Sequence, residues 1–197
     1  GVGAALFQLL WDFGWFREDS QKRGGAARGA DRRRDEVVDS MARQRIVIVG
    51  AGLAGGVAAA TLRKQGFDGL ITLVGEETRP PYSRPSLSKE YMRGEDAFED
   101  LLVNPSATYL NLDIELRLQT RAISIQPTSK FVQLESGEHL GYDRLLVTTG
   151  GRNRSIDVPG VQLDGVFGLR TLDEADRNRA AVGPGSRAGV ERRGFWG

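Results

Sequence analysis

The chain has 197 residues, enough for one domain with a hydrophobic core, and its formal net charge of +1 gives no overall attraction to nucleic acid or to an anionic membrane. It has no cysteine and one histidine, His139, which excludes a disulfide framework and argues against a thiolate or histidine metal site and a histidine-based catalytic triad. No apolar run approaches the roughly 20 residues of a membrane-spanning helix. We expect a cytoplasmic protein with no metal site, no nucleic-acid partner and no membrane partner, and we assign no catalytic residue.

Residues 1–43 differ in composition from the rest, and we expect them to be disordered or a non-native extension. The apolar stretch GAALFQLLWDFGWF is too short to span a membrane and lacks the preceding basic residues of a secretory signal. Residues 17–36 are charged and glycine-rich, which is typical of a disordered tail. A basic arm for nucleic acid is the alternative, but acidic residues are interspersed through it. Met41 lies four residues before Arg45, and we interpret it as the natural start.

An ordered pattern begins at Arg45. Residues 46–49 are continuously apolar, as in a central parallel strand covered on both faces. Residues 53–64 are rich in alanine and leucine and predict a helix that Gly66 closes. Residues 70–74 predict a second strand. Together these segments form one βαβ unit.

Shorter elements follow. Asn104 as a cap and Pro105 at the first helical position predict a helix over 104–111. Thr171 is the expected cap of another helix, over 171–182. Between them we expect strands over 114–118, 122–125, 131–134 and, as another buried strand, 142–151. The predicted fold class is α/β, a Rossmann-type parallel sheet with a small antiparallel β-meander.

Three glycines follow the first predicted strand with the spacing G-x-G-x-x-G. Gly50 permits a tight turn, Gly52 allows backbone to approach a pyrophosphate, and Gly55 allows the helix to pack against the strand. The helix N-terminus also offers unpaired N–H groups and partial positive charge to phosphates. A motif of this kind is weak alone, but here a strand precedes it and a helix follows.

An acidic residue at the end of the next strand is the second sign of dinucleotide binding. Glu76 lies 21 residues after Gly55 and directly follows ITLVG. A carboxylate there accepts hydrogen bonds from ribose hydroxyls and repels a 2′-phosphate, which disfavours NADP at this site. The alternative is a solvated glutamate, and the neighbouring Glu77 shows that glutamates are common here.

Residues 45–182 resemble a known family in three segments: GAGLAG at 50–55, PPYSRPSLSK at 80–89, and YDRLLVTTGGRNR at 142–154 followed by LRTLDEAD at 169–176. The chain resembles the N-terminal part of FAD-dependent ferredoxin and rubredoxin reductases, within the pyridine nucleotide-disulfide oxidoreductase superfamily. The resemblance implies a full-length relative that passes electrons from NADH through FAD to a ferredoxin or rubredoxin. The absence of cysteine agrees with this branch, which lacks the redox disulfide of the glutathione-reductase branch.

The resemblance also implies cofactor contacts. In that family the first glycine turn holds FAD, so the expected pyrophosphate contacts are Gly50, Gly52, Ala54 and Gly55. Glu76 would then bind the adenosine ribose.

The other implied contacts come from later segments. Arg84 and Lys89 match basic positions beside the flavin, and the backbone of Ala122 matches an adenine contact. The last matches are Thr149 and Gly150, in a turn close to the cofactor, and Arg170, a basic position that reaches it. Thr148 stands where the family has alanine, which we treat as a small departure.

The family continues with an NAD-binding domain and a second glycine motif. Residues 183–197 match that region poorly, since Arg192 stands where the first glycine is expected. We interpret them as a truncated start of the NAD-binding domain or an irregular tail, and residues 44–182 as an incomplete FAD-binding domain of a two-dinucleotide flavoprotein fold. The chain alone is then expected to be an inactive fragment. A plain NAD-binding Rossmann enzyme and a non-enzymatic fragment are the alternatives.

Overall fold

The computed structural model describes residues 43–153, 157–183 and 185–190. The described chain forms two compact units, one of residues 43–83 and 102–150 and the other of residues 84–101 and 151–190 without the gaps named above. The expected extension over 1–43 lies outside the described residues except for Arg43, and so does Arg192. Within the described ranges, no helix is both long enough and apolar enough to cross a membrane.

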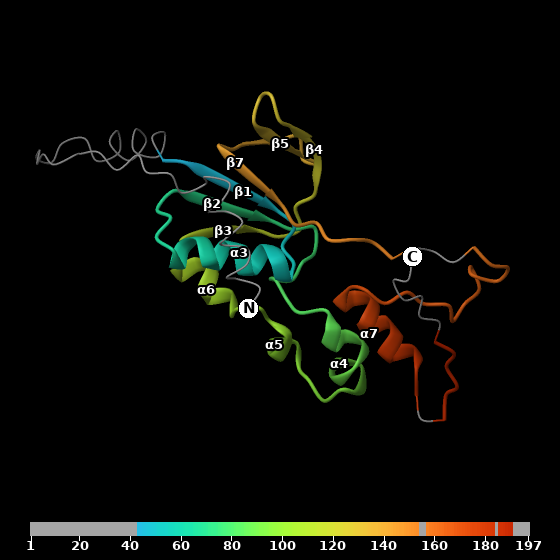
Figure 1. Ribbon diagram of the computed structural model, residues 1–197. Coiled ribbons are helices and arrows are strands. Elements are labelled where there is room, and N and C mark those ends of the chain that lie inside the picture. Colours follow the sequence, from blue (N-terminus) through green and yellow to red (C-terminus); the bar gives the residue numbers. More distant parts are fainter. Residues whose placement is uncertain (1–42, 154–156, 184, 191–197) are drawn as a thin grey trace, which may run out of the picture. The chain divides into compact units, whose positions relative to one another are not determined.

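A four-stranded parallel sheet forms the centre of the first unit (Figure 1). Its order is β3-β2-β1-β7, and its strands are β1 (Arg45–Val49), β2 (Leu70–Val74), β3 (Ile114–Arg117) and β7 (Arg144–Val147). Val49 lies opposite both Val74 and Val147, so three strands end at the same level. The predicted Rossmann-type parallel sheet is confirmed.

Helices α3 (Leu53–Lys64) and α6 (Ser106–Asn111) cover one face of this sheet (Figure 1). Alternate residues of β1, Ile46 and Ile48, point to that face and join a buried cluster with Leu62 and Tyr109. The small side chains of α3 allow close packing, since a Cβ at Gly56 would lie 2.6 Å from the Pro81 side chain.

An antiparallel meander covers the other face of the sheet. It consists of β4 (Ala122–Gln126), β5 (Phe131–Leu134) and β6 (His139–Gly141), in the order β4-β5-β6. Val47 and Val49 of β1 pack with Val132 and Leu134 of β5 in a second buried cluster. The small antiparallel sheet is therefore confirmed, with β6 as a strand that the sequence did not indicate.

The second unit is built from short helical segments: η1 (Pro85–Ser88), α4 (Glu90–Arg93), α5 (Phe98–Leu101) and α7 (Leu172–Ala181). Thr171 caps α7 as expected, in a capping box with Glu174. The hydroxyl of Tyr91 donates to the Asp176 carboxylate at 2.6 Å. Burial, followed by this hydrogen bond, raises the pKa of Tyr91 above its usual value.

Two local expectations were wrong. Pro105 occupies the cap position of α6 and the helix begins at Ser106, so Asn104 does not cap it; its amide lies 3.5 Å from the Tyr109 hydroxyl instead. The strand expected over 142–151 is shorter and half-exposed: Val147 is 52% exposed. The reason is that β7 has no neighbour on its outer side among the described residues.

Arg63, near the end of α3, ties three segments of the first unit together. Its guanidinium donates to the backbone carbonyls of Phe67, Gly69, Leu112 and Asp113 at 2.6–2.7 Å. The side chain is only 11% exposed. Because one guanidinium satisfies four backbone carbonyls, we expect Arg63 to be a major source of stability.

Replacing Arg63 by methionine should lower the free energy of unfolding by about 2–3 kcal/mol, because partly buried carbonyls lose their donors. Lys64→Met is the matched control, since Lys64 is exposed on the next position of the same helix. It should change the stability by less than about 0.5 kcal/mol. Urea denaturation of both variants measures this, and equal losses would contradict the role assigned to Arg63.

Candidate functional site

The turn between β1 and α3 is shaped by two glycines that contact protein. Gly50 has a φ of +116°, and a Cβ there would lie 2.3 Å from the Thr148 carbonyl oxygen. A Cβ at Gly55 would lie 2.0 Å from the Gly50 carbonyl oxygen. Both positions exclude any side chain. Protein packing alone therefore explains why these two residues are glycine.

Gly52 differs, because protein contacts do not require a glycine there. A Cβ on Gly52 would have nothing within 4 Å among the described residues, and its φ of −96° suits any residue. Gly52 is the N-cap of the 12-residue helix α3, with no side-chain cap and no acidic residue in the first turn. Leu53 and Ala54, which begin the helix, are exposed. Among the described residues the helix N-terminus is therefore open, and its first N–H groups have no partner within the helix.

Thr148 secures this turn from the neighbouring strand. Its hydroxyl lies 2.8 Å from the carbonyl oxygen of Gly50 and 3.2 Å from that of Val49, and its backbone N–H donates to Val49 at 2.7 Å. From the sequence, Thr148 was noted only as a departure from the alanine of the family. Its role depends on β7 lying beside β1, which no local pattern reveals. Thr149 and Gly150 follow it and are exposed.

Glu76 lies just beyond the end of β2, at the same edge of the sheet as the glycine turn. Its side chain is 63% exposed, and the Arg121 guanidinium lies 3.8 Å from its carboxylate. Ala122, the expected adenine contact, follows Arg121 at the start of β4. The neighbouring Glu77 instead accepts a hydrogen bond from the Tyr82 hydroxyl at 2.6 Å. Of the two glutamates, Glu76 is the one that presents its carboxylate to solvent.

The first unit thus brings eight expected residues to the carboxyl ends of its parallel strands and the start of β4: Gly50, Gly52, Ala54, Gly55, Glu76, Ala122, Thr149 and Gly150. Ligands of open α/β sheets bind at this edge.

The other three expected residues, Arg84, Lys89 and Arg170, belong to the second unit. Arg84 donates to the Arg170 carbonyl oxygen at 2.6 Å. The backbone of Arg170 is fixed in turn by Glu174, whose carboxylate accepts its N–H at 2.6 Å. Lys89 is exposed at the start of α4. The structure therefore places two of the three basic residues side by side.

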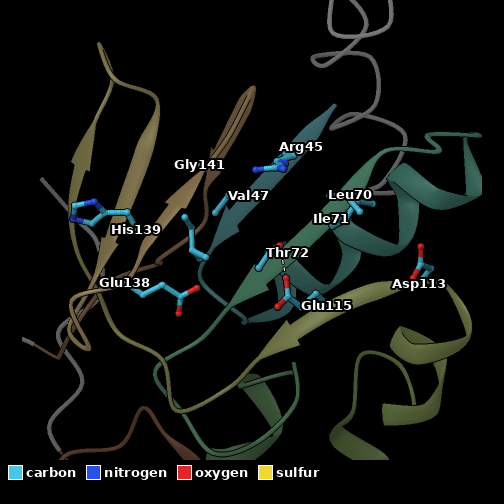
Figure 2. Close-up of a pocket in the computed structure, with 11 residues that line it drawn as sticks. Arg45, Val47, Leu70, Ile71, Thr72, Asp113, Glu115, Glu138, His139 and Gly141 are labelled. Carbon is cyan, nitrogen blue, oxygen red and sulfur yellow. Dashed lines mark hydrogen bonds between the residues drawn. The ribbon is translucent and has the colours of Figure 1, made fainter. Parts of the chain in front are cut away.

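A separate hollow of about 340 Å³ opens between β6 and the parallel sheet (Figure 2). It lies at the opposite ends of the strands, because Arg45 and Leu70, which line it, are the first residues of β1 and β2. Its lining contains none of the expected site residues: Arg45, Val47, Leu70, Ile71, Thr72, Asp113, Glu115, Glu138, His139, Leu140 and Gly141.

The carboxylate of Glu115, which lines this hollow, is held by neighbouring side chains. Glu115 accepts hydrogen bonds from Thr72 at 2.8 Å and from Arg117 at 2.7 Å. Burial raises the pKa of Glu115, but these hydrogen bonds and the charge of Arg117 outweigh it and leave the pKa below its usual value. No group of three or more potential metal ligands occurs in the part of the chain that the structure describes. The glycine turn is therefore the better candidate site.

Comparison with known proteins shows the family to which the chain is similar. The family described as "Pyridine nucleotide-disulphide oxidoreductase" matches residues 44–191. The probable ferredoxin reductase CtmF of Castellaniella defragrans is 40% identical over 156 residues, which are 79% of this chain and 38% of that protein. The 3-phenylpropionate/cinnamic acid dioxygenase ferredoxin–NAD(+) reductase component of Photorhabdus laumondii is 44% identical over 142 residues, which are 72% of this chain and 36% of that protein.

Solved structures agree. The covalent putidaredoxin reductase–putidaredoxin complex aligns with a TM-score of 0.63 and 34% identity, over 70% of this chain and 34% of the matched chain. The NADH:rubredoxin oxidoreductase of Clostridium acetobutylicum aligns with a TM-score of 0.61 and 31% identity, over 69% of this chain and 35% of that one. The chain spans about a third of the length of these relatives. Because the family match covers most of its length, the chain belongs to the pyridine nucleotide-disulphide oxidoreductase family.

Proposed function

We propose that this chain is the FAD-binding part of an NAD(P)H-dependent reductase of ferredoxin or rubredoxin. The observation that carries the proposal is Gly52, a glycine with open space at its Cβ position, above an uncapped helix N-terminus. A glycine that protein packing does not require is explained when something outside the protein must approach its backbone. A pyrophosphate is such a group, because it is anionic and accepts hydrogen bonds from helix N–H groups.

The arrangement around the turn fits the adenosine half of the cofactor. Gly50, Gly52, Ala54 and Gly55 would hold the pyrophosphate, and the exposed carboxylate of Glu76 would accept hydrogen bonds from the ribose. The backbone of Ala122 would contact the adenine. Both Glu76 and Ala122 stay accessible in the structure, Glu76 exposed and Ala122 half-buried.

The proposed contacts of the flavin half come from later segments of the chain than the glycine turn. Thr149 and Gly150 would border the cofactor, and Arg84, Lys89 and Arg170 would supply positive charge near the flavin. When bound, FAD accepts a hydride and releases electrons singly, and nearby cations stabilise its anionic reduced form. The hydrogen bond to the Arg170 carbonyl would hold the Arg84 guanidinium beside the backbone of Arg170.

A plain NAD-binding Rossmann enzyme is the competing function. The relatives favour the reductase, since the similar proteins include a ferredoxin–NAD(+) reductase component and a rubredoxin-NAD(+) reductase. We therefore propose NADH as the electron donor of the full-length protein, a ferredoxin or rubredoxin as its acceptor, and a cytoplasmic location. Residues 1–43 would be an extension without a role in binding, and residues 183–197 either the start of the NAD-binding region or an irregular tail.

Gly52→Val should abolish ADP and FAD binding while the fold survives, because the new side chain enters the space proposed for the pyrophosphate. We expect at least about a tenfold loss of affinity, equivalent to about 1.4 kcal/mol. Isothermal titration with ADP measures the loss, and thermal unfolding monitors the fold.

Gly141→Val is the matched control. Gly141 also has nothing within 4 Å of its Cβ position, but it lines the hollow of Figure 2 rather than the glycine turn. It should leave ADP affinity unchanged. If Gly52→Val binds ADP as well as the parent, the turn serves structure alone. If Gly141→Val is the variant that loses binding, the ligand occupies the hollow.

Thr148→Val should weaken ADP binding by about threefold to tenfold, because a side chain of the same shape no longer holds the Gly50 carbonyl. It should also lower the free energy of unfolding by about 1 kcal/mol through the lost hydrogen bond. Thr148→Ser keeps the hydroxyl and should bind ADP like the parent. Equal affinity in the valine and serine variants would show that the hydroxyl does not shape the turn.

The 197-residue chain by itself should not oxidise NADH. It spans about a third of its relatives, and hydride transfer requires a nicotinamide held within about 3–3.5 Å of the flavin. Mixing the chain with FAD, NADH and ferricyanide and following absorbance at 340 nm tests this. Steady NADH loss well above a control with free FAD would show that the chain supplies a complete donor site, alone or as an oligomer.

A further inference from the structure

In the described residues of the first unit, two arginines each lie between two glutamates. The ion-pair distances differ between these two groups, which we call triads. The tight triad is Glu115–Arg117–Glu138, with both ion-pair distances 2.7 Å. The loose triad is Glu76–Arg121–Glu135, with distances of 3.8 and 3.9 Å. Only the loose triad contains a residue of the proposed cofactor site.

The tight triad connects two parts of the first unit. The guanidinium of Arg117 donates to Glu115 of β3 and to Glu138, which precedes β6, and so links the parallel sheet to the meander. These hydrogen bonds, first to Glu115 and then to Glu138, raise the pKa of Arg117 above its ordinary value. Two nitrogens of this guanidinium, which is 29% exposed, thus donate to carboxylates at short distance.

In the loose triad, hydrogen bonds hold the backbone around Arg121, whereas its guanidinium makes only two long ion pairs to described residues. The Arg121 carbonyl accepts the Glu135 N–H at 2.9 Å, and the preceding Thr120 N–H donates to Gly75 at 2.8 Å, next to Glu76. Both ion-pair distances exceed the usual hydrogen-bond range of about 2.7–3.2 Å. The Arg121 side chain is 44% exposed and makes no hydrogen bond to any residue that the structure describes.

We propose that Arg121 is a positioning residue, which directs the Glu76 carboxylate toward the ribose of the bound nucleotide. This inference rests on the proposed function. A guanidinium at this distance attracts the carboxylate without occupying its oxygens, so both oxygens stay available to ribose hydroxyls. Glu135 lies 3.9 Å from another nitrogen of the same guanidinium, so the positive charge of Arg121 is shared between the two carboxylates. The net charge of the triad is −1, which also disfavours a 2′-phosphate.

The test compares ADP with 2′-deoxy-ADP, which lacks one ribose hydroxyl, by isothermal titration of the 197-residue chain. The parent should bind ADP about tenfold more tightly than 2′-deoxy-ADP, as expected for one hydrogen bond to a charged group. In Arg121→Ala the ratio should fall to less than about threefold, because Glu76 is no longer directed. Glu76→Gln should lower the ratio similarly, and the double variant should be no lower than either single one.

Arg117→Ala is the matched control, since it also removes an arginine from between two glutamates. It should lower stability and leave the ratio of ADP to 2′-deoxy-ADP affinity unchanged. A purely structural role for Arg121 would likewise leave that ratio unchanged in Arg121→Ala, and this result would overturn the inference while ADP binding itself persists. Failure of the parent to bind ADP would instead overturn the proposed function, and the inference with it.

Discussion

The close approach of backbone between the glycine turn and the end of β7 is the constraint on which the site depends. The Cβ positions of Gly50 and Gly55 fall 2.3 Å and 2.0 Å from carbonyl oxygens, so neither can carry a side chain. The hydroxyl of Thr148 then fixes the Gly50 carbonyl from the side. Helix α3 begins directly after this turn, and a Cβ at its N-cap residue, Gly52, would have no described atom within 4 Å. The turn on which the proposed cofactor site depends is therefore shaped by contacts within the protein.

The two-sided burial of β1 supports that geometry. Ile46 and Ile48 face the helices, while Val47 and Val49 face the meander, and all four are less than a tenth exposed. A strand held on both faces cannot shift its register without moving apolar side chains between two cores. The end of the strand, and with it the glycine turn, is therefore fixed in position.

The sequence predicted most of the fold where the signal was local. The helix over Leu53–Lys64 and the strand over Leu70–Val74 were predicted to the residue, because continuous apolar runs and a closing glycine mark them. The strand His139–Gly141 was missed because three residues carry too little pattern. The four-residue helical segments of the second unit were missed for the same reason. Asn104 was assigned as a cap from its residue type, but the helix begins beyond Pro105.

Candidate site residues that lie in a contiguous motif could be predicted from the sequence. Residues that reach the site from other strands could not. Gly52 and Glu76 follow from the glycine spacing and the end of the next strand. Thr148, just after β7, contacts Gly50 of the glycine turn, and Arg121, just before β4, lies near Glu76, although both come from segments remote in sequence. The strand order places β7 beside β1, and a backbone hydrogen bond between the segment after β3 and the end of β2 places Arg121 near Glu76. No local pattern marks either residue.

Amide chemical shifts of the 15N-labelled chain during titration with ADP report where the nucleotide binds. If it binds at the glycine turn, the largest saturable changes will fall on Gly52, Leu53 and Ala54, whose N–H groups lie at the start of α3. Changes centred on Thr72 and His139, in the hollow of Figure 2, would contradict binding at the turn, and so would an ADP titration without saturable change.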